Sequence, residues 1–216
     1  MADVDDRRSD GDRTHGRRGR ATRRRFLDAT AGLLESPGYR GLTVADIARD
    51  AGTSPATFYL YFSSAEDAVL ALASEMADTA APQLAAVIED RTWSGTEGWR
   101  AALDVSDAFI ALWESDRSIL RVIDLVTDEG DLRFREVRTR LLAGPAEAFV
   151  EVLRSRNDGA VTDPFADAGV LVSMLAHVAA HLDGLEAWGA GRDELRRSMA
   201  RVVFTTLTGA PPDGVG

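Results

Sequence analysis

The chain has 216 residues, of which 45% are hydrophobic and 28% are charged, and its formal net charge is -10. This composition suits one or two globular domains with real cores, and the absence of cysteine excludes disulfides and thiolate chemistry. Because no apolar run is long enough to span a bilayer and the N-terminus lacks the apolar stretch of a signal peptide, we expect a cytoplasmic protein without membrane association.

Charge is distributed unevenly along the chain. Residues 1–62 contain 11 arginines and 9 acidic residues, whereas residues 63–216 contain 14 arginines and 26 acidic residues. The basic excess peaks in RTHGRRGRATRRR, residues 13–25, which has seven arginines and no acid. Such asymmetry is typical of a nucleic-acid-binding arm on an acidic body, although a disordered, solvated tail would have the same composition.

Helical periodicity runs through almost the whole chain, and the period-2 alternation of strands is absent, so the expected fold class is all-α with about nine helices. We expect a disordered Arg-rich arm over residues 1–18, a small helical domain over 19–65, a larger one over 66–208 and a frayed tail over 209–216. The predicted helices cover about 20–36, two short segments within 43–62, and about 64–90, 96–115, 117–127, 131–156, 164–188 and 192–208.

The segment TVADIARDAGTSPATFYLYF, residues 43–62, predicts two short helices joined by a tight turn. Thr43 is suited to cap the first helix, and Gly52 can supply the positive φ that ends it. Ser54 can cap the second helix, with Pro55 in its first turn. This arrangement is a helix-turn-helix. The apolar face of the first helix consists of Val44, Ile47, Ala48 and Ala51, and that of the second of Phe58 and Phe62.

Two local features are expected to shape the longer helices. Ser63 and Glu66 have the spacing of a capping box for the helix that follows the helix-turn-helix. Pro145, preceded by Gly144, is expected to kink or break the helix predicted over 131–156, because proline removes a backbone donor and clashes with the preceding turn.

The order of residues in the helix-turn-helix carries a resemblance. The pattern Thr43-x3-Ile47-Ala48-x2-Ala51-Gly52-x-Ser54-x2-Thr57-Phe58-Tyr59-x-Tyr61-Phe62 closely resembles the DNA-binding domain of the TetR family of bacterial transcriptional regulators. The resemblance covers about residues 22–72, and the rest of the chain resembles the family only in length and all-helical layout. It implies an N-terminal three-helix DNA-binding domain and a C-terminal helical ligand-binding and dimerisation domain.

The resemblance also implies roles for individual residues. Thr43 would face a phosphate, the start of the recognition helix would meet base edges or phosphates, Tyr59 would bond the DNA backbone and Tyr61 would reach a base or phosphate. Two positions depart from the family pattern: Thr53 replaces the usual Val, and Ala65 replaces a usual Lys, so core packing and one phosphate contact are in doubt. Arginines 17, 18, 20, 23 and 24 of the arm could compensate. The expected DNA-binding residues are Arg23, Thr43, Thr53, Ser54, Pro55, Ala56, Thr57, Tyr59 and Tyr61.

Aromatic and apolar residues recur through the larger domain. They suit either a packed core or a mostly apolar pocket with a few polar groups, and the resemblance favours a pocket. The expected ligand-binding residues are Trp99, Phe109, Trp113, Ile119, Ile123, Phe149, Met174, His177 and His181.

His177 and His181 are spaced so that they could share a metal, but no acidic or cysteine partner stands at ligand spacing, so neither a metal nor a cofactor is expected. Hydrogen bonding to a ligand or to a partner helix is the more modest role for this pair. No nucleophile motif, Gly-rich phosphate loop or paired-carboxylate signature is present, and we therefore expect no enzymatic activity.

The family usually dimerises through its last two helices, which here implies a homodimer that recognises a palindromic operator in double-stranded DNA. The expected function is that of a ligand-responsive transcriptional regulator, a repressor released from its operator by a small, largely apolar molecule. Two alternatives remain open: a ligand-independent DNA-binding activator, and a small-molecule carrier whose DNA reader has decayed, as the departures at Thr53 and Ala65 hint. The effector, the operator and the target genes are not encoded in any pattern recognised in the sequence.

Overall fold

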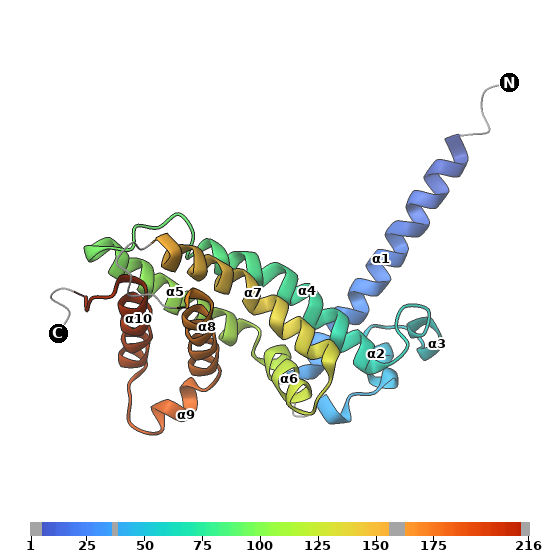
Figure 1. Ribbon diagram of the computed structural model, residues 1–216. Helices are drawn as coiled ribbons and strands as arrows, with labels where there is room; N and C mark the ends of the chain where they lie inside the picture. Colours follow the sequence, from blue (N-terminus) through green and yellow to red (C-terminus); the bar gives the residue numbers. More distant parts are fainter. Residues whose placement is uncertain (1–5, 36–38, 156–162, 213–216) are drawn as a thin grey trace. The chain divides into compact units, whose positions relative to one another are not determined.

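The computed structural model describes residues 6–35, 39–155 and 163–212. These residues form ten α-helices and one 3-10 turn without any strand, which confirms the all-α fold class (Figure 1). The chain divides into two compact units, Met1–Ser74 and Glu75–Gly216. The elements are α1 Asp6–Leu34, η1 Tyr39–Gly41, α2 Val44–Asp50, α3 Pro55–Phe58, α4 Ala65–Ala86, α5 Gly95–Ser115, α6 Arg117–Asp128, α7 Leu132–Ser155, α8 Pro164–Ala180, α9 Leu182–Glu186 and α10 Arg192–Thr208.

The first helix is longer than the sequence predicted. It begins at Asp6, whereas we expected a disordered arm as far as residue 18 and a helix from about residue 20. The segment contains no proline, and arginine, which occupies many of its positions, is a good helix former. The basic segment is therefore part of a continuous helix that leads into the N-terminal unit.

The N-terminal unit is built around a small aromatic core. Phe26 of α1 packs edge-on against Phe58 at a ring-centroid distance of 5.2 Å and against Phe62 at 6.4 Å. Aromatic pairs in this edge-to-face geometry add to the free energy gained by burial alone. The buried residues of this core are Phe26, Leu27, Ala29, Ile47, Ala48, Ala51, Phe58, Phe62 and Ala68.

The start of α4 belongs to this core, which moves the boundary between the units. Ala68 is fully buried, and Ala65, Ala71 and Leu72 pack against the same cluster. The units accordingly divide after Ser74, further along the chain than the expected boundary at residue 65.

The cap of α4 also differs from the prediction. The side-chain oxygen of Ser64 accepts a hydrogen bond from the backbone N–H of Asp67 at 3.1 Å, while the Ser63 hydroxyl donates to the carboxylate of Asp67. The predicted capping box of Ser63 and Glu66 is therefore wrong by one residue, because the helix begins at Ala65.

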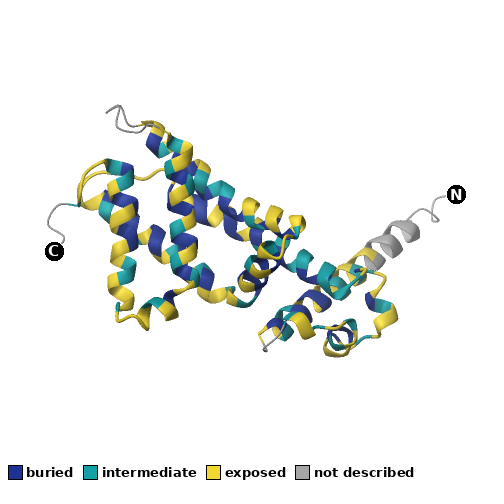
Figure 2. Cartoon of the chain, turned by 60° about the horizontal axis from the view of Figure 1, so that its bottom comes forward, coloured by how far each residue is buried: buried dark blue, intermediate teal, exposed yellow. Residues whose placement is uncertain are grey.

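In the C-terminal unit, α5 packs against α8 and α10, and α7 packs against α6 and α8. The buried residues form stripes along the inward sides of these helices (Figure 2). The predicted helix at 164–188 is divided into α8 and α9 at His181, whereas the predictions for α5, α6 and α10 agree with the structure to within about a residue.

The structure has no break at Pro145, since α7 is one helix from Leu132 to Ser155, while the kink expected as the alternative stays a prediction. Gly144 faces α4 so closely that an added Cβ would lie 3.2 Å from the carbonyl oxygen of Ala81. An ion pair of 2.9 Å between Arg140 and Asp78 joins the same two helices. Gly144 therefore allows close packing of α7 against α4. Within the described residues, no helix is both long and apolar enough to cross a membrane.

We predict opposite effects for two glycine substitutions in the N-terminal unit. Gly52 has φ of 65° and no atom within 4 Å of an added Cβ, so Gly52→Ala should lower the free energy of unfolding by about 1 kcal/mol through backbone strain alone. Gly32 lies inside α1 with equally open surroundings, so Gly32→Ala should instead raise it by about 0.5–1 kcal/mol. Urea unfolding of both variants checks this, and equal effects at the two positions would contradict it.

Candidate functional site

The turn between α2 and α3 is closed by two backbone hydrogen bonds. The N–H of Thr53 donates to the carbonyl of Ala48 at 2.8 Å, and the N–H of Gly52 donates to that of Arg49 at 3.1 Å. With Gly52 at φ of 65°, this is a Schellman motif, which confirms the predicted role of Gly52. Thr53 is half-buried and contributes its backbone to the turn, so the departure at this position leaves the turn intact.

Thr43 caps α2, as predicted. Its side-chain oxygen accepts from the N–H of Asp46 at 3.2 Å and its hydroxyl donates to the Asp46 carboxylate at 2.6 Å. The guanidinium of Arg49 lies 2.5 Å from the same carboxylate. The Thr43 hydroxyl and then Arg49 hold the pKa of Asp46 below its ordinary value, so this carboxylate remains ionised and paired at neutral pH.

Ser54 caps α3, also as predicted. Its side-chain oxygen accepts from the N–H of Thr57 at 3.2 Å, and the two hydroxyl oxygens lie 3.0 Å apart. Pro55 occupies the first turn, where its missing N–H costs no hydrogen bond. Ser54, Pro55 and Ala56 are exposed, Thr57 is half-buried, and Tyr59 is 59% exposed.

Tyr61 and Arg23 are placed differently from the rest of the expected DNA-binding set. The ring of Tyr61 lies 5.7 Å from that of Phe26, and its hydroxyl is 3.8 Å from the position a Cβ on Gly19 would take. The guanidinium of Arg23 lies 5.4 Å from the ring centroid of Phe62. Both side chains therefore pack on the aromatic core as well as reaching the surface between α1 and α3, and their contact with DNA stays a prediction.

Leu60 is a surface residue that the sequence analysis missed. It is 80% exposed and lies between Tyr59 and Tyr61. The sequence pattern could have predicted its exposure. Phe58 and Phe62 are buried at i and i+4, so the residue midway between them points to the opposite side of the helical turn.

Arginines on the described part of α1 form a basic surface in the N-terminal unit. Arg24 is paired with Asp28 of the same helix at 2.8 Å. The exposed arginines of this surface are Arg17, Arg18, Arg20, Arg24 and Arg25.

Most of the expected ligand-binding residues lie in the interior of the C-terminal unit. Phe109 and Trp113 stack at 6.0 Å with an interplanar angle of 12°, and Trp99 meets Phe204 edge-on at 6.2 Å. The indole N–H of Trp113 is buried and has no hydrogen-bond partner among the described residues. Ile119, Ile123 and Phe149 are likewise buried.

Trp99 is only half-buried, and the remaining three expected residues lie on α8 or at its C-cap, with Met174 half-buried and His177 and His181 exposed. Met174 and His177 line a shallow groove of about 770 Å³, together with Arg138, Phe165, Val170 and Ser173. The rings of His177 and His181 stack at 4.2 Å, and Nδ1 of His181 lies 2.9 Å from the carbonyl oxygen of His177. In the described part of the chain, no three His, Cys, Asp or Glu side chains are grouped as a metal would require.

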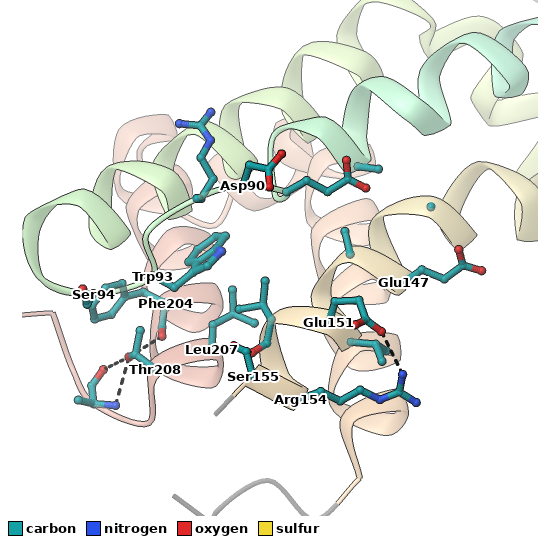
Figure 3. A pocket seen from close by; sticks show the side chains of 18 of the residues that line it. Asp90, Trp93, Ser94, Glu147, Glu151, Arg154, Ser155, Phe204, Leu207 and Thr208 are labelled. Atoms are coloured by element: carbon teal, nitrogen blue, oxygen red, sulfur yellow. Dashed lines mark hydrogen bonds and ion pairs between the residues drawn. The ribbon is translucent and has the colours of Figure 1, made fainter. Parts of the chain in front are cut away.

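A cavity of about 1280 Å³ lies elsewhere in the C-terminal unit (Figure 3). None of the nine expected ligand-binding residues lines it. Its walls come from the end of α4, the loop before α5, the second half of α7, the start of α8 and the end of α10, so no single stretch of sequence could reveal it. The labelled lining residues are Asp90, Trp93, Ser94, Glu147, Glu151, Arg154, Ser155, Phe204, Leu207 and Thr208.

Comparison with known proteins gives a matching family profile in each of the two units. A family profile described as "Bacterial regulatory proteins, tetR family" matches residues 26–72, and one described as "Tetracyclin repressor-like, C-terminal domain" matches residues 84–213. The chain is 27% identical over 119 residues to the fatty acid metabolism regulator protein of Bacillus subtilis (strain 168). That alignment covers 55% of this chain and 59% of the Bacillus protein, which is less than two thirds of its length.

Solved structures share the fold. A TetR-family transcriptional regulator from Mesorhizobium loti matches with a TM-score of 0.68 and 23% identity, covering 90% of this chain and 98% of that one. The regulator FadR from Bacillus subtilis, solved in complex with stearoyl-CoA, matches with a TM-score of 0.65 and 17% identity, covering 86% of this chain and 98% of that one. With the second profile spanning more than half of its length, the chain belongs to the TetR family of bacterial transcriptional regulators.

Proposed function

We propose that this regulator is a cytoplasmic, non-enzymatic repressor that binds a palindromic operator as a homodimer and leaves it when a small, largely apolar molecule binds its C-terminal unit. The observation that carries the proposal is the intact helix-turn-helix, in which α2 and α3 are both capped and α3 presents its first residues to solvent. A recognition helix of this kind reads base edges with the residues at its start.

Neither departure from the family pattern disturbs the fold of the helix-turn-helix. Thr53 closes the turn through its backbone, and Ala65 packs against the aromatic core. The arginines exposed on α1 supply positive charge in the same unit. These observations favour a DNA-binding regulator over a carrier whose reader has decayed.

An exposed stripe on α8 that includes the apolar side chains of Ala166 and Val170 supports the dimer. Ala166, Val170, Ser173 and His177 recur at i, i+4, i+7 and i+11, and each of them is exposed. Val170 is 66% exposed, and Val202 on α10 is 45% exposed. Large apolar side chains left in water on two neighbouring helices are typical of an interface between subunits.

Ligand release requires that the effector bind the two states of the dimer with different affinities. The relatives named as fatty acid regulators suggest an effector with a long apolar part. The proposal takes only this apolar character from the relatives. The chain is 17% identical to FadR, and it matches 59% of the length of the Bacillus subtilis regulator.

Fluorescence anisotropy tests the proposal as a whole. We expect the protein to prefer duplex DNA from upstream of its own gene over scrambled DNA of equal length, with an affinity that falls steeply as salt rises. Equal binding to both duplexes at every salt concentration would contradict sequence-specific recognition.

Removing positive charge from the exposed arginines of α1 should weaken the salt dependence of DNA affinity. It should not change the preference for the operator over other sequences. For Arg18→Gln with Arg20→Gln, the slope of log affinity against log salt should become shallower by about 0.9 for each phosphate that the protein no longer neutralises. Arg135→Gln, an exposed arginine on α7, is the matched control and should leave the slope unchanged. An unchanged slope in the double variant would mean that Arg18 and Arg20 do not contact the DNA backbone.

A charge placed on the α8 stripe should separate the dimer. Val170→Asp should elute as a monomer in size-exclusion chromatography with light scattering and lose operator affinity, because two linked half-sites are needed for tight binding. Leu132→Asp is the control, since Leu132 is 68% exposed but lies on α7, away from the stripe. A dimeric Val170→Asp protein would exclude this face as the interface.

A further inference from the structure

We propose that the 1280 Å³ cavity of the C-terminal unit binds an amphipathic organic cation, so that the effector of this chain differs in charge from the acyl-CoA bound by its Bacillus relative. Binding of the cation follows from the cavity alone. Only its action as an effector rests on the proposed function.

The floor of the cavity is apolar and aromatic. Trp93 precedes α5, while Phe204 and Leu207 come from α10, and all three line the cavity (Figure 3). Phe204 and Leu207 are almost fully buried. Of these three side chains the half-buried Trp93 is the one open to a ligand, and its ring face can accept apolar groups and attract a cation.

Both arginines among the described lining residues of the cavity already have partners. Arg91 is paired with Asp104 at 3.2 Å. Arg154 is paired with Glu151 at 3.0 Å, and its guanidinium lies 4.9 Å from the ring centroid of Phe165. Neither arginine is therefore left as a free anchor for the phosphates of an anionic ligand.

Among the described lining residues, acidic side chains outnumber basic ones. Glu89, Asp90 and Glu147 line it, and the side chain of each is exposed. Across residues 6–35, 39–155 and 163–212, no ion pair or side-chain hydrogen bond joins any of these three carboxylates to another group. Glu89 and Asp90 come from the segment that follows α4, and Glu147 comes from α7.

The paired arginines and the three carboxylates without a partner among the described residues together favour a positively charged ligand. A cationic head beside these carboxylates would gain Coulomb energy that no residue of the described chain now supplies, while its apolar part contacts Trp93. An anionic head in the same place would be repelled by all three. The sequence alone could not show this, because the carboxylates are scattered among 35 acidic residues.

Two probes of equal shape and opposite charge test the proposal. We expect tetraphenylphosphonium to bind the intact protein in isothermal titration calorimetry, and tetraphenylborate to bind at least about tenfold more weakly. Stearoyl-CoA should not displace the phosphonium ion. Equal or tighter binding of the borate, displacement by stearoyl-CoA, or no binding of the cation at millimolar concentration would each overturn the proposal.

Variants then locate the site. Glu89→Gln, Asp90→Asn and Glu147→Gln combined should weaken phosphonium binding by about tenfold, while Glu136→Gln, an exposed carboxylate elsewhere on α7, should not. Asp90 has φ of 52°, a conformation that asparagine tolerates, so the triple variant should keep the native fold, which circular dichroism checks. Unchanged phosphonium affinity in the triple variant would place the cation elsewhere and overturn the assignment of this cavity.

DNA binding is measured separately, so that failure of the two proposals can be distinguished. Binding of the phosphonium ion without operator binding would support the cation site and contradict the proposed regulator. Operator binding with discrimination against the phosphonium ion would support the regulator and contradict the cation site.

Discussion

The packing of Phe26 against Phe58 and Phe62 holds the DNA-binding unit together. By itself α3 is a helix of only four residues, Pro55–Phe58, far shorter than a helix that is stable alone in water. Its direction therefore depends on the aromatic core beneath it and on the capped turn that precedes it. Any surface that α3 offers to a base pair is set by contacts on its opposite side.

The chain uses its acidic residues in two ways. Several join the helices of the C-terminal unit, as when Arg196 of α10 pairs with Asp107 of α5 and Arg117 of α6 pairs with Asp183 of α9. Such exposed pairs each contribute little to stability. The three carboxylates Glu89, Asp90 and Glu147 have no such partner among the described residues, and their charge remains available to a ligand. The negative charge of the C-terminal unit thus favours two things. It keeps DNA away from that unit, and it favours a cation over an anion as the ligand of the unit.

Local chemistry explains what the sequence could predict. Thr43, Gly52, Ser54 and Pro55 act on backbone groups within a few residues of themselves, and the structure places all four as predicted. The helices of the C-terminal unit were also predictable, because their apolar periodicity extends over several turns.

Features that depend on distant contacts could not be predicted in this way. The helix α7 continues through Pro145, where Gly144 packs against Ala81 of α4, a neighbour more than sixty residues away. The boundary after Ser74 depends on the burial of Ala68 in the core of the N-terminal unit. The cavity depends on five separate segments meeting, and so the predicted ligand residues lie in the core or on α8 instead.

Selection of bound sequences from a random duplex library tests the central claim, that two linked copies of α3 read DNA. We predict enrichment of an inverted repeat whose half-sites are separated by about one helical turn or more. Recovery of sequences no different from the starting library would contradict specific recognition, and enrichment of a single half-site without symmetry would contradict the two-fold dimer.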